Sequence, residues 1–353
     1  MADDLAWDPF DRELHHDPHP VWQRMRDEAP VYWNEEYGFF ALSRFADVYE
    51  ASLDTEVFSS AHGITLDMIQ DEPREPPTPL IMQDPPVHTA LRKIVNRTFT
   101  PRRMAQLEDR IHELCAGYLD PFVGSGGFDF VRDFSMRLPV MVISTLLGFP
   151  EEDHEQLRVW NDAQIHRDPG NPNLTEEGQV AMGHLVTYYS DQIRQRRERP
   201  RDDIVSDLIT AELHLPDGTV RHLDDGELIV FIITVNLAGN ETVARLLGWA
   251  ALTLSRNPAE RAKLVAEPTL VPGAVEELLR YDAPSPVQGR FTKRAVTYHD
   301  VEIPKGSKVL LLTGAAGRDE REYDDPDVFD VQRQITRHVS FGHGAHFCLG
   351  AAL

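Results

Sequence analysis

One long helix constrains the fold of this chain more than any other feature of its sequence. Residues 225–255 read as a single helix, which Asp224 or Asp225 can cap and which ends before Asn257-Pro258. About 31 residues at ~1.5 Å each span roughly 47 Å, which is enough to cross a whole domain. We therefore expect a helical protein packed around this segment.

The middle of that helix contains a run that works against helical regularity, Ala238-Gly239-Asn240-Glu241-Thr242. Gly239 costs about 1 kcal/mol relative to alanine, and the Thr242 hydroxyl can compete for a backbone carbonyl one turn back. We expect a local distortion here that makes room for something small. The alternative is a packing glycine beside a solvated Glu241.

A single cysteine lies in a glycine-rich loop, Phe341-Gly342-His343-Gly344-Ala345-His346-Phe347-Cys348-Leu349-Gly350. The three glycines allow the backbone to turn tightly and to approach a flat ligand closely. A thiolate presented in this way is a metal ligand. A zinc site that combines Cys348 with nearby histidines (His338, His343, His346) is an alternative, but no second cysteine pair completes it. A buried structural cysteine is another.

The spacing F-x-x-G-x-x-x-C-x-G, at Phe341, Gly344, Cys348 and Gly350, resembles the haem-binding loop of the cytochrome P450 family. The resemblance implies haem b (iron protoporphyrin IX) as the cofactor, with Cys348 as the axial ligand of the metal. It also implies that Phe341, Gly342 and Gly350 belong to the cofactor-binding loop.

An earlier helix begins at Asp84-Pro85-Pro86-Val87-His88. His88 and Arg92 are four residues apart, share one face and can both reach one anion. The segment 84–101 resembles the family's D-P-P-x-H-x-x-x-R stretch, which implies that His88 and Arg92 bind a haem propionate. A solvated basic helix face is the alternative. By the same resemblance, Arg290 and His346 match two further propionate-binding positions.

Two further motifs carry the resemblance. The run in the long helix matches the family signature A-G-x-[DE]-T, which implies that dioxygen sits beside Ala238 and Gly239. Thr242 then hydrogen-bonds the bound oxygen, and Glu241 links it to a proton relay. Glu277-Leu278-Leu279-Arg280, with Arg333 as third partner, resembles a scaffold motif; by itself such a pair is worth a few tenths of a kcal/mol at a surface.

Composition narrows the class of protein. A formal net charge of −23 argues against nucleic acid as a partner. Cys115 and Cys348 are the only cysteines, too few for a disulfide framework, and the opening residues 1–4 do not read as a signal sequence. The longest apolar run, 228–235, is shorter than the roughly 20 residues of a membrane helix. These observations predict a cytoplasmic protein with no membrane anchor.

The expected fold class is mainly α, a cytochrome P450 fold of many helices with a minor β portion. We expect a single domain over residues 1–353 from which the family's C-terminal helix and strands are missing. Ser43 and Thr100 are expected helix caps. Expected helices lie at about 20–27, 101–119, 128–147, 151–163, 175–199, 225–255 and 272–280, and another starts at 84–88. Expected strands lie at about 31–33, 39–42, 285–291, 293–301 (around a turn) and 308–312.

The resemblance implies a haem-thiolate monooxygenase that inserts one atom of dioxygen into an apolar small molecule. Electrons come from NAD(P)H through a ferredoxin reductase and a ferredoxin. The alternatives are a peroxide-driven peroxygenase, which Glu241-Thr242 disfavours, and a haem-thiolate sensor without catalysis. Segments 62–82, 166–174 and 284–289 are the expected substrate contacts. Basic residues that predict a docking surface for an acidic ferredoxin are Lys93, Arg97, Arg102 and Arg103.

Overall fold

The computed structural model describes residues 5–166 and 174–353, and the chain forms two compact units. The first unit combines residues up to Arg74 with 81–85 and 249–348. The second combines 75–80, 86–248 and 349–353. Helices dominate and strands are few, which confirms the expectation of a mainly α chain. That residues 1–353 act as one domain stays a prediction.

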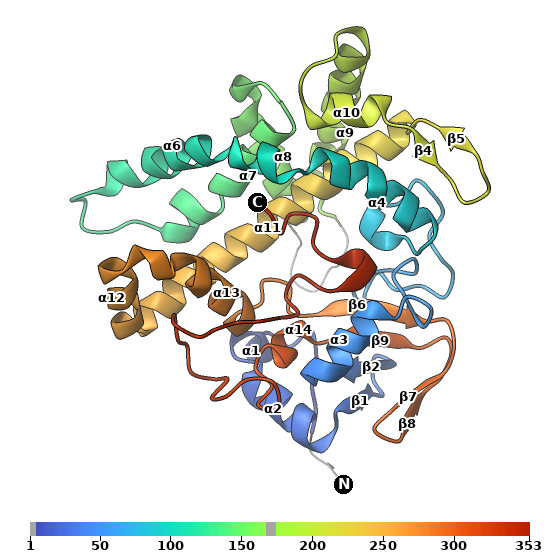
Figure 1. Cartoon of the computed structure of the whole chain (residues 1–353), viewed down its shortest axis with the longest axis vertical. Helices are drawn as coiled ribbons and strands as arrows, with labels where there is room; N and C mark the ends of the chain where they lie inside the picture. The colour runs from blue at the N-terminus through green and yellow to red at the C-terminus, as the bar shows by residue number, and fades with distance from the viewer. Residues whose placement is uncertain (1–4, 167–173) are drawn as a thin grey trace. The chain divides into compact units, whose positions relative to one another are not determined.

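The first unit is built on a five-stranded sheet with the strand order β1-β2-β9-β6-β3. Strands β2 and β9 pair in parallel, with Ala41 opposite Leu310, and the other pairs are antiparallel. The sheet therefore joins the two ends of the sequence, seen in Figure 1 as blue strands beside orange ones. Its strands are β1 (Val31–Asn34), β2 (Phe39–Leu42), β3 (Phe58–Ser59), β6 (Gln288–Thr292) and β9 (Lys308–Leu311).

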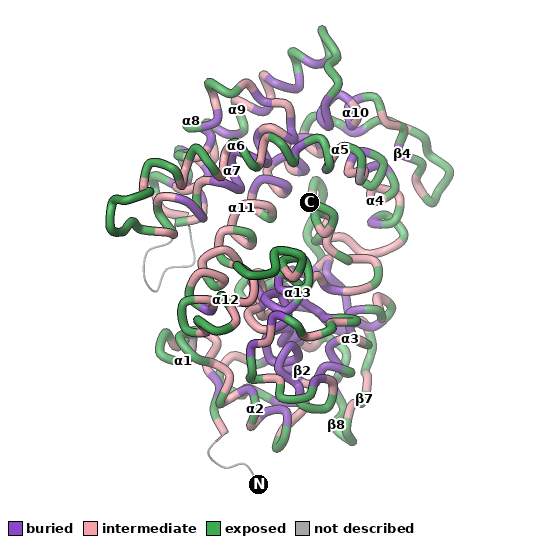
Figure 2. The backbone as a smooth tube through the Cα atoms, turned by 60° about the vertical axis from the view of Figure 1, so that its left-hand side comes forward, coloured by how far each residue is buried: buried purple, intermediate pink, exposed green. Residues whose placement is uncertain are grey.

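Both faces of this sheet are buried. Leu310 packs in a cluster with Trp22 and Phe39, whereas Leu311 packs in a second cluster with Phe45. Neighbouring residues of a strand point to opposite faces, so each face of β9 contributes to a different core. Figure 2 shows the resulting concentration of buried backbone around β2.

Short helices surround the sheet in the first unit. They are α1 (Arg12–His16), α2 (His19–Glu28), α3 (Phe45–Leu53), α12 (Pro258–Ala266), α13 (Val271–Tyr281) and α14 (Thr313–Ala316), with 3₁₀ turns at Pro268–Leu270 and Gly344–His346 and a hairpin of β7 (Val296–Tyr298) and β8 (Val301–Ile303). A further 3₁₀ turn covers Leu80–Met82. The predicted strands 31–33 and 39–42 and the predicted helix 272–280 are confirmed.

The prediction that Ser43 caps α3 is wrong. The Ser43 hydroxyl is buried and has no hydrogen-bond partner among the described residues, and the helix begins after Arg44. Instead, the Phe45 N–H donates to the Asp319 carboxylate at 2.8 Å. Asp319 is only 1% exposed, so a distant buried carboxylate satisfies the first turn of α3.

The second unit is almost entirely helical and has a single large apolar core, drawn from residues 94–235. Two predicted helices are interrupted: α5 ends at Ala105 before α6 begins, and a π-helical turn precedes α7. The Thr100 cap of α5 is confirmed, because its Oγ1 accepts from the Arg103 N–H at 3.3 Å. The elements are α4 (Val87–Thr98), α5 (Pro101–Ala105), α6 (Glu108–Leu119), the π turn Val131–Ser135, α7 (Leu138–Leu146), α8 (His154–Ile165), α9 (Glu176–Glu198), α10 (Ile204–Thr210), β4 (Leu213–His214), β5 (Val220–Arg221) and 3₁₀ turns at Asp120–Phe122 and Glu151–Asp153.

Helix α11 (Asp225–Arg256) is the predicted long helix. Asp224 and Glu227 form a reciprocal capping box at its start, since each side chain accepts from the other's backbone N–H at 2.8 and 2.9 Å. Within the described part of the chain, α11 is the one helix whose length and composition are sufficient to cross a membrane. The core helix of a water-soluble protein has the same composition, and Leu228 and Ile232 of α11 are fully buried.

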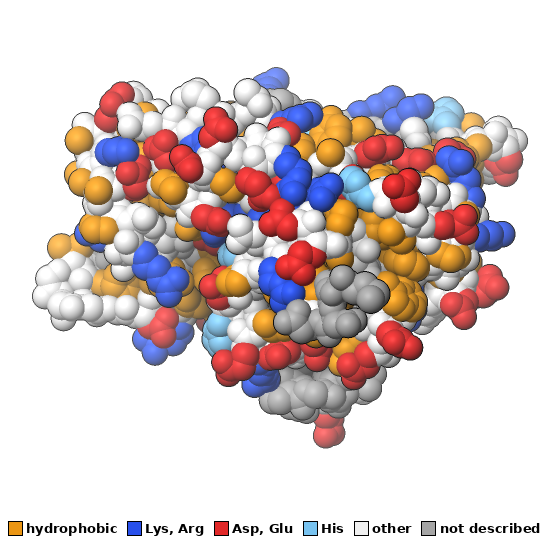
Figure 3. Space-filling view, turned by 90° about the horizontal axis from the view of Figure 1, so that it is seen from below, with side chains coloured by type: hydrophobic (Ala, Val, Ile, Leu, Met, Phe, Trp, Pro, Cys, Tyr) orange, Lys and Arg blue, Asp and Glu red, His pale blue; other side chains and the backbone are white. Residues whose placement is uncertain are grey.

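Charged side chains of both signs are intermixed on the face shown in Figure 3, without one field of a single sign. Exposed ion pairs of the first unit include Arg24 with Glu28 and Arg321 with Asp27, both at 2.8 Å. Pairs of this kind each contribute less than about 1 kcal/mol to stability. The core and the buried polar contacts therefore decide the fold.

Candidate active site

The loop that carries Cys348 is folded back on itself by its glycines. Gly342 and Gly344 both have left-handed backbone angles, with φ of 65° and 67°. The Cys348 N–H donates to the Phe341 carbonyl at 2.8 Å, which closes the loop. Cys348 is half-buried in this loop, and Gly350 follows in a turn in which its carbonyl accepts from the Leu353 N–H. The predicted tight turn is confirmed.

Contacts with α3 hold this loop in place. A Cβ added at Gly344 would lie 3.2 Å from Leu53 Cδ2 and 3.3 Å from the Ser52 carbonyl oxygen, so the loop packs closely on the helix at this glycine. The ring of His343 packs on Tyr49 with 4.4 Å between centroids. His346 lies at the end of the 3₁₀ turn, two residues before the cysteine.

The structure gives no support to a zinc site in this loop. Among the described residues, no three His, Cys, Asp or Glu side chains are grouped so that they could hold a metal ion. His338 Nε2 lies 2.9 Å from Glu276 Oε2, and His343 Nε2 lies 2.9 Å from the His338 carbonyl. Two of the three proposed histidine ligands thus make hydrogen bonds elsewhere.

The predicted scaffold of Glu277, Arg280 and Arg333 is confirmed. Arg280 binds Glu277 through two hydrogen bonds of 2.6 and 2.8 Å, and both side chains are fully buried. Arg333 Nε donates to the same carboxylate at 3.2 Å. Arg280 also donates to the carbonyls of Gly317 and Pro326, so α13 holds the segments that precede the cysteine loop.

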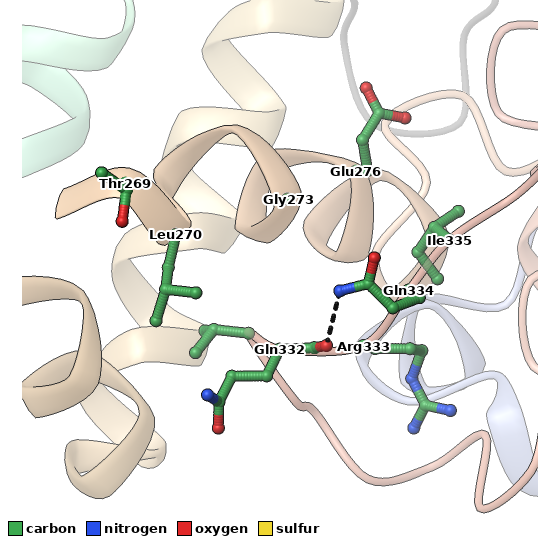
Figure 4. Close-up of a pocket in the computed structure, with 9 residues that line it drawn as sticks. Thr269, Leu270, Gly273, Glu276, Gln332, Arg333, Gln334 and Ile335 are labelled. Atoms are coloured by element: carbon green, nitrogen blue, oxygen red, sulfur yellow. Dashed lines mark hydrogen bonds between the residues drawn. The ribbon is translucent and has the colours of Figure 1, made fainter. Parts of the chain in front are cut away.

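A surface groove of about 350 Å³ lies beside this scaffold (Figure 4). Residues of α13 and the segment 331–335 line it, including Arg333, Gln332 and Gln334. Gln334 Nε2 donates to the Gln332 carbonyl at 3.2 Å. None of the predicted cofactor or catalytic residues lines this groove, so it is not the candidate site.

Arg290 on β6 is a buried cation that has no ion-pair partner among the described residues. It is only 6% exposed and donates to the Gly289 carbonyl at 2.7 Å and, more weakly, to Gln288 Oε1 at 3.4 Å. Within the described chain it has no carboxylate partner, and burial lowers the pKa of its guanidinium to about 10 although Asp84 acts in the opposite direction. A buried charge of this kind requires compensation. The site therefore fits a ligand that carries a carboxylate, as haem does.

Helix α4 positions His88 and Arg92 one turn apart, as predicted. His88 is 1% exposed, which argues against a solvated basic face, and Arg92 is half-buried. Arg92 Nε donates to Asn96 Oδ1 at 2.8 Å, which orients the guanidinium along the helix. The helix thus presents one buried imidazole and one positioned cation.

Helix α11 runs without interruption through Ala238–Thr242, so the expected distortion is not found. Gly239 is closely packed instead: an added Cβ would lie 2.7 Å from Ile143 Cδ1 on α7, so the Ile143 side chain would have to move. The predicted competition by Thr242 is confirmed: its hydroxyl donates to the Ala238 carbonyl at 2.6 Å. Glu241 is paired with Arg245 one turn later, and 43% of its side chain is exposed.

The predicted basic cluster needs one correction. Arg103 donates to Asp207 at 2.7 Å and to Asp202 at 3.2 Å, so it ties α5 to α10 and is not free to contact a partner. The sequence did not indicate this, since the acidic partners lie about a hundred residues later. Lys93, Arg97 and Arg102 are exposed.

Two of the three segments predicted to contact substrate come together in the first unit. The Gly289 N–H donates to the Ile64 carbonyl at 2.7 Å, and a Cβ at Gly289 would lie 2.9 Å from the Ile64 backbone. Close approach of two backbones explains the glycine. Of the third segment, 166–174, residues 167–173 lie outside the described part of the chain.

Comparison with known proteins agrees with these features. The cytochrome P450 family model matches residues 171–353. Cytochrome P450 130 of Mycobacterium tuberculosis is 40% identical over 350 residues, covering 95% of this chain and 84% of that protein. The vitamin D(3) 25-hydroxylase of Pseudonocardia autotrophica is 37% identical over 350 residues, covering 98% and 85%.

Solved structures show the same fold. CYP109E1 of Bacillus megaterium in complex with corticosterone matches with a TM-score of 0.85 and 33% identity, covering 96% of this chain and 87% of that one. The TM-score and the sequence identity are both well above the level at which two proteins share only a fold. The chain with the glycine-turned Cys348 loop and the buried Arg290 is thus a member of the cytochrome P450 family, a haem-dependent monooxygenase.

Proposed function

We propose that this P450 binds haem b through Cys348 and hydroxylates an apolar small molecule with electrons from NAD(P)H, delivered by a ferredoxin reductase and a ferredoxin. The observation that carries the proposal is the Cys348 loop, in which glycine turns and the Cys348–Phe341 hydrogen bond present one half-buried thiol. We also propose a cytoplasmic location, in line with the cysteine content.

Cys348 Sγ is the proposed iron ligand, and four basic residues are the proposed propionate partners: Arg290, His346, His88 and Arg92. Arg290 supports this assignment most directly, because its buried charge has no carboxylate partner in the described chain. The backbone of Phe341, Gly342 and Gly350 shapes the loop around the sulfur. When bound, the haem supplies the redox chemistry that reduces dioxygen, places one oxygen atom in a substrate C–H bond and releases the other as water.

Thr242 and Glu241 are proposed to handle protons beside Ala238 and Gly239. The Thr242 hydroxyl hydrogen is held by the Ala238 carbonyl, so its oxygen lone pairs are oriented to accept a hydrogen bond. The Glu241 carboxylate is held by Arg245 and is partly exposed, so it can exchange protons with solvent and, on leaving Arg245, pass them toward Thr242. Thr242 and Ala238 share one face of α11, and Glu241 and Arg245 share the neighbouring face.

An apolar, polycyclic substrate is favoured by the relatives. One relative is a vitamin D(3) 25-hydroxylase, and structures of CYP109E1 contain corticosterone or testosterone. In this chain, the segments around Ile64 and Gly289 are the proposed contacts. The exposed Lys93, Arg97 and Arg102 are the proposed docking residues for an acidic ferredoxin, whose attraction is screened within about 8 Å at physiological salt.

The test is the carbon monoxide complex of the reduced protein. Wild type should show the red-shifted Soret band of thiolate-ligated haem, and Cys348→Ala should abolish it. Cys115→Ala is the matched control, because Cys115 is the other cysteine and burial raises the pKa of its thiol, which disfavours the thiolate. Persistence of the band in Cys348→Ala, or its loss in Cys115→Ala, would show that the ligand is assigned incorrectly.

A further inference from the structure

His338 lies ten residues before the cysteine, and both of its ring nitrogens are engaged. It is 9% exposed. Nε2 lies 2.9 Å from Glu276 Oε2, and Nδ1 lies 3.2 Å from the backbone nitrogen of Ser340. Glu276 lies at the edge of the groove, and Figure 4 shows its carboxylate pointing away from Gln332 and Arg333.

These partners fix the tautomer of the ring. A backbone N–H can only donate, so Nδ1 must be the unprotonated nitrogen that accepts from Ser340. Nε2 then carries the only ring hydrogen and donates it to Glu276. The imidazole is therefore neutral. Burial agrees with this state, because it lowers the pKa of His338 despite the opposing charge of Glu276.

The same residues tie the start of the loop to α13. The Ser340 hydroxyl donates to the Leu279 carbonyl at 2.5 Å, and His343 Nε2 donates to the His338 carbonyl at 2.9 Å. The turn at Gly342 follows directly, with its N–H donating to the Val339 carbonyl at 2.9 Å. The path of the chain into the cysteine loop is thus set at His338 and Ser340.

We propose that His338 is a positioning residue for the thiolate: as the Nε2–H tautomer it accepts the Ser340 N–H, holds the loop start on α13 and so keeps Cys348 in place. This inference rests on the proposed role of Cys348. It assigns to the Glu276–His338–Ser340 contacts a function separate from that of the Glu277 scaffold.

Two substitutions of His338 test the hydrogen bonds of its two ring nitrogens separately. In His338→Asn, the amide oxygen stands where Nδ1 was and can still accept from Ser340. In His338→Gln, the amide NH₂ stands near the position of Nε2 and can still donate to Glu276, but the Ser340 N–H loses its acceptor. His222→Gln, an exposed histidine of the second unit, is the control for the substitution itself.

Two readouts are needed, and one does not depend on haem chemistry. Amide hydrogen exchange of the peptide 338–348 should be about fivefold faster in His338→Gln than in wild type, the factor expected for one lost hydrogen bond. His338→Asn and His222→Gln should exchange like wild type. In the carbon monoxide complex, His338→Gln should convert part of the thiolate band to the unshifted band, and His338→Asn should not.

The proposal is overturned if the Gln and Asn variants are alike, whether both match wild type or both fail. A measurement on unaltered protein guards against misfolded variants: ¹⁵N chemical shifts of labelled histidine should show His338 with hydrogen on Nε2, and hydrogen on Nδ1 would overturn the proposal. A wild-type protein without any thiolate band would refute the proposed function instead, while the exchange and tautomer results still test the hydrogen bond.

Discussion

Replacing Glu277 by glutamine is the most demanding test of the scaffold in the first unit. The Glu277 carboxylate accepts hydrogen bonds from Arg280 Nε and Nη2, from Arg333 Nε and from the Asp330 N–H. Glutamine keeps the size of the side chain but removes the charge and turns one acceptor into a donor. Two guanidinium groups, of which Arg280 is fully buried, are then left without neutralisation.

The expected loss in the free energy of unfolding follows from the burial of the Arg280–Glu277 pair. Removing one partner of a buried ion pair costs about 3–5 kcal/mol, because the remaining charge stays desolvated. Each kcal/mol lowers the melting temperature by about 2–4 °C in a cooperative unit of about 150–250 residues. The Glu277→Gln protein should therefore melt roughly 6–20 °C below wild type, measured by circular dichroism at equal haem content.

The same substitution in an exposed pair is the control. Glu28 pairs with Arg24 one helical turn away, and both side chains are 40% exposed. Glu28→Gln should cost about 0.3–0.5 kcal/mol and shift the melting temperature by no more than about 2 °C. If Glu277→Gln melted within about 2 °C of Glu28→Gln, the argument from burial would be refuted.

Three other substitutions give clear expectations. Arg290→Met should leave the haem-free protein at least as stable in urea but weaken haem binding about 10- to 150-fold, the equivalent of one charged hydrogen bond; reduced stability of the haem-free protein would contradict the assignment. His19, whose pKa is lowered to about 3 chiefly by burial and then by Arg318, contributes stability above pH 6.5 that is lost as the pH falls from 6.5 toward 3. Between about pH 7 and about pH 4, the melting temperature of His19→Phe should therefore fall less than that of wild type; equal falls in the two proteins would contradict this. Thr242→Ala should bind substrate normally while a larger share of NAD(P)H is consumed without product; unchanged coupling would argue against its proton role.

Local features of this chain could be predicted because neighbouring residues determine them. The bond from the Thr242 hydroxyl to the Ala238 carbonyl and the Asp224 cap of α11 both act within one helical turn. The turns at Gly342 and Gly344 follow from the freedom of glycine to adopt positive φ.

The wrong predictions involve partners that are distant in sequence. Ser43 has the right residue type for a cap, but Asp319, which is 274 residues after Phe45, accepts the Phe45 N–H instead. Gly239 was expected to distort α11, whereas it lies in a regular helix and packs closely against Ile143 on another helix. His338 was considered only as a zinc ligand, and its hydrogen bond to Glu276 across 62 residues could not be read from spacing. In each case tertiary contacts, which a local pattern does not contain, decided the outcome.

The parallel pairing of β2 with β9 also has a consequence for the order of folding during synthesis. Residues 39–42 emerge from the ribosome early but cannot complete their sheet until residues 308–311 have been made. The core of the second unit, by contrast, is drawn from residues 94–235 and is available well before that point. Because domains form as units in the order of synthesis, the second unit can be folded while the first still exposes strand edges and apolar side chains such as Phe39 and Leu42. The N-terminal segment is therefore the part of the nascent chain most exposed to aggregation and most in need of a chaperone.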